Sequence, residues 1–531
     1  MDNDIIFTGD LARSTISGML RRKEIVELGH GVYTTDTSRL PEDVVRRNWL
    51  TIAGHLFPRG TVTDRSAPRA GPVDRVLYLA HDRRDREVAL PGLTISARRG
   101  APPQPGDTEM APGGLHFASK ARGLVENAIP SRSRGGRPPR RLTRAELGDW
   151  VDHICKNWGE KELNSVRDQA RQLADTLGAT AEAIADLDIM IGAALGTKEA
   201  GDLPRSLLAR QRGFPYDQER ARLFDRLVLA LRESPPQGLP AGPENTYLPF
   251  YEAYFSNFIE GTEFTVDEAL KIVYDHDVPV GRDGDAHDIV GTYLVVNDHD
   301  EMTRLASTPQ EFLDLVRSRH AAIMAGRLDK HPGELKTRAN QAGATQFVDP
   351  ALVEGTLIEG YRRLADLDTP WERSVLTMFV VSEVHPFDDG NGRTARVMMN
   401  AELEAGRNMR TIIPTVFRED YLGALRRLSR SDDPSVLIKA LRYANDFTSR
   451  IDFSDLDKAR QELEAANAFE LPEPGNHLVL PSRTLFDAPL PPVDLGVVPQ
   501  ATPGSAIFVR PYKRKGGTPV SGHKRRARQR R

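Results

Sequence analysis

Cysteine is almost absent from this chain, because only one of its 531 residues, Cys155, carries a thiol. A single cysteine cannot form an intramolecular disulfide, so the sequence excludes a disulfide-stabilised fold and suits a reducing compartment. The segment from Trp150 to Trp158 has helical periodicity, so we expect Cys155 at a core or half-buried position on a helix. We therefore do not expect it to act as a nucleophile.

Long apolar runs are also lacking. No stretch of about 18 apolar residues occurs, so we expect no transmembrane helix and no membrane partner. Residues 1–5, Met-Asp-Asn-Asp-Ile, are acidic where a secretory signal would be basic. We therefore expect a cytoplasmic protein.

Neither sign of charge dominates, since the net charge is −3, and this balance favours no class of partner. The distribution is uneven, because the last 22 residues hold ten Lys or Arg and no Asp or Glu. Such an end either contacts nucleic-acid phosphates or stays a solvated tail, and we favour the tail. The basic, proline- and glycine-rich residues 131–141 allow the same two interpretations.

Hydrophobic periodicity predicts a mainly helical protein with a small α+β head. The head is expected to be a winged helix-turn-helix-like domain over residues 1–80, followed by a strand-containing and then helical region over 81–233. A linker rich in proline and glycine follows at 234–243, and a helical domain that holds the chemistry at 244–452. Residues 470–531 are expected to form a disordered basic tail.

The head is predicted from a short pattern of helices and strands. Residues 8–23 predict two short helices with Thr8 as N-cap, and residues 25–28 and 32–34 predict a hairpin. Residues 20–33 resemble the winged-helix heads of abortive-infection-type antitoxins. This resemblance implies DNA as a partner, through a second helix that would enter the major groove.

The most informative segment is His385-Pro-Phe-Asp-Asp-Gly-Asn-Gly-Arg-Thr-Ala-Arg396. An apolar helix precedes it, so His385 lies at a helix C-terminus, where the dipole would favour the protonated imidazole. A proline then prevents the helix from continuing, and Phe387 can anchor the loop in the core. His385 is a candidate general base for a hydroxyl nucleophile.

The second half of this segment predicts an anion site. Gly390, Asn391 and Gly392 let backbone N–H groups converge where a new helix begins. Arg393 and Arg396 are three apart and project from one helix face, as a polyphosphate site requires. The neighbouring Asp389 is a hard oxygen ligand of the kind that Mg²⁺ or Mn²⁺ bridging phosphates needs. The alternative is a loop held by Arg–Asp pairs with His385 as a helix cap.

This segment resembles the signature of the Fic (Fido) family, His-x-Phe-x-Asp/Glu-Gly-Asn-Gly-Arg-x-x-Arg, at every defined position. The resemblance implies the helical Fic fold with a β-hairpin flap. It also implies that His385 deprotonates a hydroxyl of a protein, which attacks the α-phosphorus of ATP and releases pyrophosphate. Asp389 would hold the metal ion and Phe387 would be structural. The nucleotide would be bound by Gly390, Asn391, Gly392, Arg393 and Arg396.

Two flanking segments extend the resemblance. Residues 320–327 and 331–337 resemble the stretch that leads into the family's flap, with Lys336 where the family often has Arg. The flap tip would then be residues 339–345, with Gly343 as the turn followed by Ala344 and Thr345, and it would align a target by strand addition. Tyr421 lies in a segment that resembles the part closing over adenine, where it either stacks on the base or packs in an amphipathic helix.

A candidate regulatory helix precedes the motif. Ser256 and Glu260 are four apart on one helix face, and Gly261 follows as a helix terminator. This pattern resembles the family's inhibitory motif, Ser/Thr-x-x-x-Glu-Gly/Asn, in the class that carries it upstream of the catalytic motif. Glu260 would then pair with Arg396 at the γ-phosphate position; the alternative is an exposed acidic helix end.

Three functions remain open from the sequence. The first is an auto-inhibited protein adenylyltransferase that modifies Ser, Thr or Tyr of a target or of itself, with de-AMPylation through Glu260 as a variant. The second is a Fic enzyme with another donor group, such as UMP or phosphocholine. The third is a DNA-binding, toxin–antitoxin-like regulator whose Fic domain is a sensor. Self-association into a homo-oligomer is compatible with all three.

Overall fold

The computed structural model describes residues 4–110, 114–132, 138–234, 239 and 245–481, and four short strands between 506 and 526. The chain divides into two compact units, Met1–Gln218 and Glu219–Arg531. Most of the predicted linker at 234–243 lies outside the described residues. So does most of the predicted tail beyond residue 481.

The N-terminal unit begins with a three-stranded sheet in the order β1-β3-β2 and one helix. The elements are β1 (Ile5–Phe7), α1 (Arg13–Arg21), β2 (Val26–Gly29), β3 (Val32–Thr34) and α2 (Pro41–Leu56). The predicted hairpin is present. One of the two helices predicted over residues 8–23 is present as α1, whose N-cap is Ala12 and not Thr8. The other is absent, because residues 8–11 form a turn closed by a bridge between Thr8 and Leu11. Among the described residues, therefore, the head has no second helix ahead of the hairpin.

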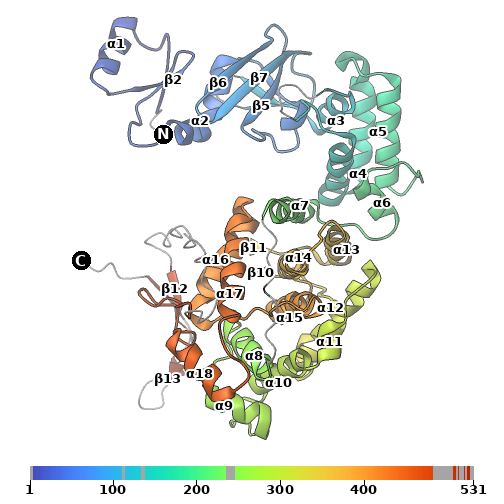
Figure 1. Cartoon of the computed structure of the whole chain (residues 1–531). Coiled ribbons are helices and arrows are strands. Elements are labelled where there is room, and N and C mark those ends of the chain that lie inside the picture. The colour runs from blue at the N-terminus through green and yellow to red at the C-terminus, as the bar shows by residue number, and fades with distance from the viewer. Residues whose placement is uncertain are drawn as a thin grey trace. The chain divides into compact units, whose positions relative to one another are not determined.

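A six-stranded mixed sheet follows, in the order β6-β7-β5-β4-β9-β8. Its strands are β4 (Thr61–Val62), β5 (Val76–His81), β6 (Arg86–Leu90), β7 (Leu93–Arg99), β8 (Thr108–Met110) and β9 (Leu115–Phe117), with the turn η1 (Asp64–Ser66) after β4. Figure 1 shows β5, β6 and β7 side by side. The strand-like alternation over residues 75–100 correctly indicated these three strands.

Helices complete the N-terminal unit. They are α3 (Lys120–Ala128), α4 (Arg144–Leu177), α5 (Ala181–Ala194) and α6 (Arg205–Gln211). Thr143 and Glu146 close α4 with a reciprocal capping box, and the predicted apolar face is buried, with Val151 and Ile154 fully enclosed. Cys155 is buried on α4 as expected, its Sγ donates to the carbonyl of Ala194 at 3.5 Å, and burial raises the pKa of its thiol.

Part of the basic segment 131–141 has a structural role. Arg140 donates to the buried carboxylate of Asp64 at 2.7 Å, and Arg98 pairs with the same group at 2.9 Å. The side chain of Arg141 is 16% exposed, 3.7 Å from that carboxylate. These arginines stabilise the unit's interior, and residues 133–137 lie outside the described residues.

The C-terminal unit is almost wholly helical. Its helices are α7 (Gln218–Glu233), α8 (Leu248–Ile259), α9 (Val266–Leu270), α10 (Asp283–Asn297), α11 (His299–Thr303), α12 (Pro309–Ile323), α13 (Val353–Leu364), α14 (Pro370–Val384), α15 (Asn391–Ala405), α16 (Arg418–Ser431), α17 (Ser435–Thr448) and α18 (Leu456–Ala465). Short helical turns are η2 (Lys271–Asp275), η3 (Leu328–Lys330), η4 (Pro350–Leu352) and η5 (Thr415–Phe417), and the described strands of its core are β10 (Gln341–Ala342) and β11 (Thr345–Gln346).

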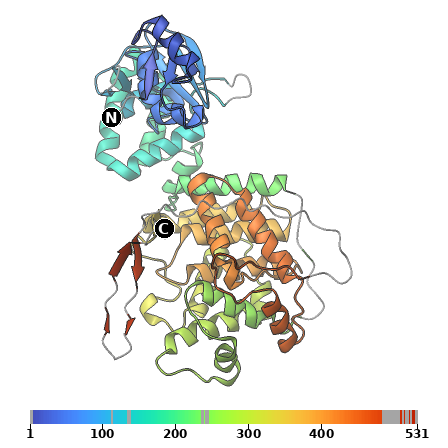
Figure 2. The same cartoon turned by 90° about the vertical axis from the view of Figure 1, so that its left-hand side faces the viewer.

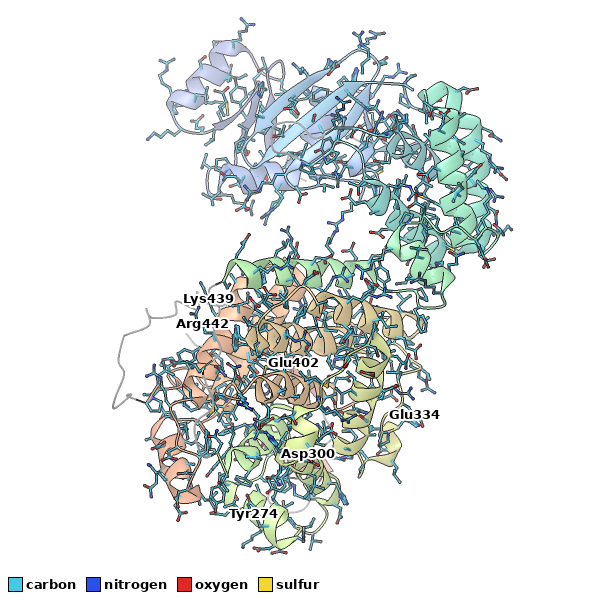
Figure 3. The ribbon with its side chains drawn as sticks, turned by 45° about the vertical axis from the view of Figure 1, so that its right-hand side comes forward. Tyr274, Asp300, Glu334, Glu402, Lys439 and Arg442 are labelled. Carbon is cyan, nitrogen blue, oxygen red and sulfur yellow. The ribbon has the colours of Figure 1, made fainter. Side chains whose placement is uncertain are left out.

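The α14–α15 pair lies at the centre of this unit (Figure 1). Thr369 and Glu372 form a capping box that starts α14, and Pro370 occupies its first turn. The apolar residues of α14 are buried as predicted, and Arg373 on it pairs with Glu402 of α15 at 3.0 Å. Glu402 is labelled in Figure 3. These contacts fix the loop that joins the two helices.

The end of the chain departs from the prediction in part. Residues 470–481, assigned to the disordered tail, lie against the helical unit, because Leu478 is buried and its carbonyl accepts a hydrogen bond from Tyr443 at 2.9 Å. Farther along, β12 (Ala506–Val509) pairs with β15 (His523–Arg526), and β13 (Tyr512–Lys513) with β14 (Pro519–Val520). Figure 2 shows the two pairs of strands in dark red.

Within the described residues, no helix is both long enough and apolar enough to cross a membrane.

Candidate active site

His385 follows the last residue of α14 and ends the helix. Its φ of 52° is left-handed, and its backbone N–H still donates to the carbonyl of Val381. The ring of Phe347 stacks on the imidazole, with centroids 3.7 Å apart and planes 4° from parallel. The Nδ1 atom lies 3.4 Å from the carbonyl oxygen of Ser382. If Nδ1 carries the proton for this contact, Nε2 keeps its lone pair and can accept a proton.

The prediction that the His385 imidazole is protonated was wrong. Burial lowers the pKa of its imidazole to about 4, and the positive charge of Lys336 acts in the same direction. Both effects oppose the helix dipole, so His385 is neutral near pH 7. A neutral imidazole is the form that a general base requires.

The loop after His385 is fastened by its own side chains. Phe387 is fully buried, as predicted, and His320 stacks on its ring at 3.6 Å. Asn391 accepts a hydrogen bond from the backbone of Phe387 at 2.8 Å and donates one to its carbonyl at 2.9 Å. The side chain of Asn391 therefore holds the loop, and only its backbone can contribute to an anion site.

Lys336 and Asn340, which precede the hairpin, hold the loop after His385 by hydrogen bonds. The buried Lys336 donates from Nζ to Asn340 at 2.7 Å and from its backbone to the carbonyl of Pro386 at 2.8 Å. Asn340 donates to the carbonyl of Phe387 at 3.0 Å. Burial lowers the pKa of Lys336 to about 8. These hydrogen bonds of Lys336 and Asn340 join the hairpin to the residues around His385.

The start of α15 requires glycine at two positions. Gly390 is the N-cap and has a φ of 72°, and a Cβ added there would meet Met324 Sδ at 2.7 Å. A Cβ added to Gly392 would lie 2.1 Å from the Glu260 carboxylate. Glu260 therefore already occupies the space in front of this helix N-terminus, where an anion is favoured.

Arg396 is engaged by the end of α8. Its Nη2 donates to Glu260 at 2.7 Å and to the carbonyl of Ser256 at 2.8 Å, and its Nε donates to Ser256 Oγ at 2.9 Å. Removal from water favours the protonated Glu260, but the charge and hydrogen bond of Arg396 outweigh this and lower the pKa of Glu260. Gly261 follows with a φ of 93°, which ends α8 as predicted.

Arg393 has partners that the sequence did not indicate. Its Nη1 lies 3.0 Å from Asp288 and 3.4 Å from Asn257 Oδ1, and its Nη2 lies 3.8 Å from Asp389. Asp288 also pairs with Arg327 at 2.8 Å. The two guanidinium groups lie close to the same helix N-terminus, as predicted, but both are occupied.

Asp389 is the residue best suited to hold a divalent cation. Its side chain is 50% exposed, and one oxygen accepts the N–H of Gly390 at 2.7 Å. The part of the chain that the structure describes has no group of three acidic, His or Cys side chains around a metal position. One carboxylate beside a phosphate site nevertheless fits Mg²⁺, which binds through few protein oxygens and completes its shell with phosphate and water.

The predicted hairpin is present at the expected place. Residues 341 and 342 of β10 pair with 346 and 345 of β11 around a two-residue turn of Gly343 and Ala344. Gly343 has a φ of 58°, which such a turn requires. The turn and β10 are exposed, while Thr345 is half-buried.

Of the two alternatives left open for Tyr421, stacking on the base would require an open ring face, and the ring has none. It is 1% exposed, and its hydroxyl donates to Met378 Sδ at 3.4 Å and also hydrogen-bonds with Arg396. A ring enclosed on both faces cannot stack on a base without repacking, so packing in an amphipathic helix is the better interpretation.

The sequence did not indicate the contacts that five residues make at the site: Phe347, His320, Asn340, Asp288 and Arg418. Each reaches the site from another element, at no fixed spacing from the motif. The segment leading to the hairpin was recognised, so Asn340 and Phe347 were within reach of the prediction.

Comparison with known proteins agrees with this geometry. The Fic/DOC family model matches residues 311–403. Protein adenylyltransferase fic-1 of Caenorhabditis elegans is 26% identical over 166 residues, which cover 30% of this chain and 31% of that protein. Protein adenylyltransferase Fic of Nematostella vectensis is 28% identical over 239 residues, which cover 43% of this chain and 55% of that protein.

The chain thus spans 31% and 55% of the length of these two curated relatives. Among solved structures, Fic-1 from C. elegans is 16% identical, with a TM-score of 0.33 and coverage of 61% of this chain and 88% of that chain. Residues 311–403, which contain the His385 loop and the start of α15, therefore form a Fic/DOC domain.

Proposed function

We propose that this chain is an auto-inhibited protein adenylyltransferase that transfers AMP from ATP to a hydroxyl of a protein. The observation that carries the proposal is the juxtaposition of a neutral His385 with a helix N-terminus whose anion position is filled by Glu260. The names of the curated relatives support the same reaction.

In this proposal the base acts on the incoming hydroxyl. Nε2 of His385 takes the proton while the hydroxyl oxygen bonds to the α-phosphorus of ATP. The bond from that phosphorus to the bridging oxygen breaks, and pyrophosphate leaves. Phe347 and the Ser382 carbonyl keep the imidazole in one orientation, which lowers the entropic part of the barrier.

The start of α15 and the arginines stabilise the phosphates. The backbone at Gly392 lets the chain approach oxygen atoms closely, and Arg396 supplies a guanidinium fork beside it. Asp389 would hold Mg²⁺ or Mn²⁺, which neutralises phosphate charge when bound.

Inhibition follows from the position of Glu260. Its carboxylate pairs with Arg396 and occupies the space in front of Gly392, so a terminal phosphate must displace it. Until that happens, ATP binds weakly or with its α-phosphate out of reach of His385. Ser256 holds the same arginine from the preceding helical turn and reinforces the blocked state.

The test is incorporation of label from ATP labelled at the α-phosphate, with Mg²⁺ and with Mn²⁺. We expect weak labelling of the wild type, strong self-labelling of Glu260→Gly, and none for the double variant Glu260→Gly/His385→Ala. A gain of at least about tenfold for Glu260→Gly corresponds to about 1.4 kcal/mol of relieved competition. A silent Glu260→Gly variant that still binds ATP contradicts the proposal and favours a regulatory Fic domain.

The donor is tested separately. If Glu260→Gly labels with UTP or a phosphocholine donor but not with ATP, the mechanism stands and the donor is another group. Removal of AMP is tested by incubating labelled Glu260→Gly protein with wild-type chain and following label loss. DNA binding by the head, with its basic α1 terminus, is tested by a salt-dependent shift of promoter DNA.

A further inference from the structure

A polar pocket beside the tip of the β10–β11 hairpin has no part in the transfer chemistry. Its volume is about 270 Å³, and it is lined by Arg220, Ala344, Thr345, Gln346, Ser429 and Arg430. Pockets for drug-sized ligands and cofactors run from about 300 to 1,000 Å³. This pocket is smaller, so it suits one or two side chains of a polypeptide.

The pocket has one uncompensated positive charge. Arg430 on α16 donates from Nε at 3.2 Å and from Nη2 at 2.7 Å to the hydroxyl of Thr345. No carboxylate among the described residues lies within ion-pair distance of it. Its neighbours on the same helix differ, because Arg427 pairs with Asp433 at 3.2 Å and Arg426 with Glu419 at 3.5 Å.

The other charges of the pocket cancel. Arg220 pairs through Nε with the buried carboxylate of Glu383 at 3.0 Å, and Ser429 donates to the same carboxylate at 2.5 Å. Among the described residues at this wall, the one acidic group, Glu383, is thus paired and buried. An anionic side chain that enters would meet the charge of Arg430 without repulsion from a free carboxylate of the described wall.

The hairpin places this pocket beside the path of a target. Residues 340 and 347 share a ladder hydrogen bond, so the backbone groups of Gln341 and Gln346 point away from the hairpin. The carbonyl of Gln346 already accepts from Arg220 at 2.5 Å. The open edge is therefore that of β10, and a strand added there runs past the tip at Gly343 and Ala344.

We propose that this pocket is a specificity subsite that takes an acidic side chain of the target segment near the modified hydroxyl. The inference rests on the proposed function and adds the class of target sequence. The Arg430 guanidinium, which donates to the Thr345 hydroxyl in this structure, would donate to the carboxylate of the target instead. Because Arg430 does not touch the reacting atoms, it affects binding of the acidic segment and leaves the turnover of the bound one unchanged.

The experiment uses the full chain with Glu260→Gly and a series of fluorescent peptides. Each peptide has one Thr acceptor in an uncharged background, with a single Glu placed from four residues before it to four after it, and a Gln peptide matched to each. Fluorescence anisotropy measures binding, and label from ATP measures transfer. We expect one or two Glu positions to bind at least about tenfold more tightly than Gln, the size of one charge-assisted contact.

Charge reversal identifies the residue responsible. Arg430→Glu should abolish the preference, reverse it for a Lys peptide, and leave kcat/KM for the Gln peptides unchanged. Arg430→Gln should abolish the preference without reversing it. Lys439→Glu is the matched control, since it makes the same charge change at an exposed position of α17 that does not line the pocket (Figure 3).

Each outcome decides one question. Equal binding of Glu and Gln peptides at every position overturns the subsite, as does a preference that survives Arg430→Glu or disappears in Lys439→Glu. A preference that depends on Arg430 in the binding assay, with no label transferred from ATP to any peptide, supports the subsite and contradicts the proposed function.

Discussion

At the scale of single residues, the Phe347 ring covers one face of the His385 imidazole, and burial lowers the pKa of this imidazole. A base works when it is neutral, so activity requires a pH above its pKa. With a pKa of about 4 instead of the ordinary 6.5, the active form persists far into the acid range.

This residue predicts a specific pH dependence. In the Glu260→Gly background, kcat/KM should stay level below pH 6.5 and fall only as the pH approaches 4. Phe347→Ala admits water to the ring, raises the pKa, and should move this acid limb upward by about one pH unit. Phe347→Leu keeps the site apolar and should move it less. If kcat/KM falls at the same pH in Glu260→Gly and in both Phe347 variants, the stacked ring does not set the pKa of His385.

Gly392 allows a test of the anion site that does not remove Glu260. In Gly392→Ala the new methyl group would lie 2.1 Å from the Glu260 carboxylate and must displace it. Because the methyl then fills the place of a phosphate oxygen, we expect no activation and weaker ATP binding, in contrast to Glu260→Gly. Titration calorimetry with ATP and the labelling assay measure both. Activation equal to that of Glu260→Gly would exclude Gly392 from the phosphate site.

The sequence predicted the positions of some site residues and missed the contacts of others. The order and spacing from His385 to Arg396 fixed the loop, the helix start and the buried Phe387, because these depend on local backbone chemistry. Asp288 and His320 come from other helices, and no local spacing indicates a contact made across the fold. The protonation of His385 was wrong because burial, which the sequence does not give, outweighs the helix dipole.

At the scale of elements, α8 depends on what holds its C-terminal end. Arg418, the first residue of α16, donates to the carbonyl of Ile259 at 2.9 Å, one residue before Glu260. This contact joins the last turn of α8 to the start of α16. Inhibition is therefore a property of two helices as well as of one carboxylate.

Loss of this contact should raise the basal transferase activity. In Arg418→Ala a partly buried, charge-assisted hydrogen bond is removed, and such bonds contribute about 1.5–3 kcal/mol when fully formed. We expect basal self-labelling to rise several-fold above wild type and to stay below that of Glu260→Gly. Arg407→Ala, an exposed arginine after α15, is the control. Labelling at the wild-type level would mean that α8 holds its position without Arg418.

Elements with strong periodicity were predicted well, and short ones were not. The helix preceding His385 and the helix capped by Thr143 have a continuous apolar face and clear start signals. Residues 5–7 were missed because a three-residue strand has no periodicity of its own and exists only through its pairing with β3. One of the two helices expected over residues 8–23 is absent because residues 8–11 form a turn closed by a bridge between Thr8 and Leu11.

At the scale of the whole molecule, the two units have separate interiors. The buried clusters of residues 5–115 and 121–207 belong to the first unit, and the cluster of residues 223–478 to the second. Each unit also has a capping box of the same kind, at Thr143 and at Thr369. Because each unit has such a capping box, the same substitution can be made in each unit and the two effects compared.

We expect two separable unfolding transitions in scanning calorimetry. Thr369→Ala should lower the midpoint of one and Thr143→Ala that of the other, each by about 2–4 °C for a loss of about 1 kcal/mol. ATP with Mg²⁺ should raise only the transition that Thr369→Ala lowers, and more strongly in Glu260→Gly. A single transition that both substitutions shift equally would show that the units unfold together.

The buried thiol of Cys155 has a practical consequence for following the hairpin. It is the only cysteine of the chain, it is enclosed on α4, and its raised pKa keeps it in the unreactive protonated form. The native protein therefore offers no competing site to maleimide chemistry. A fluorophore attached at the hairpin tip through Ala344→Cys would report, in real time and without a cysteine-free background, when a target strand arrives.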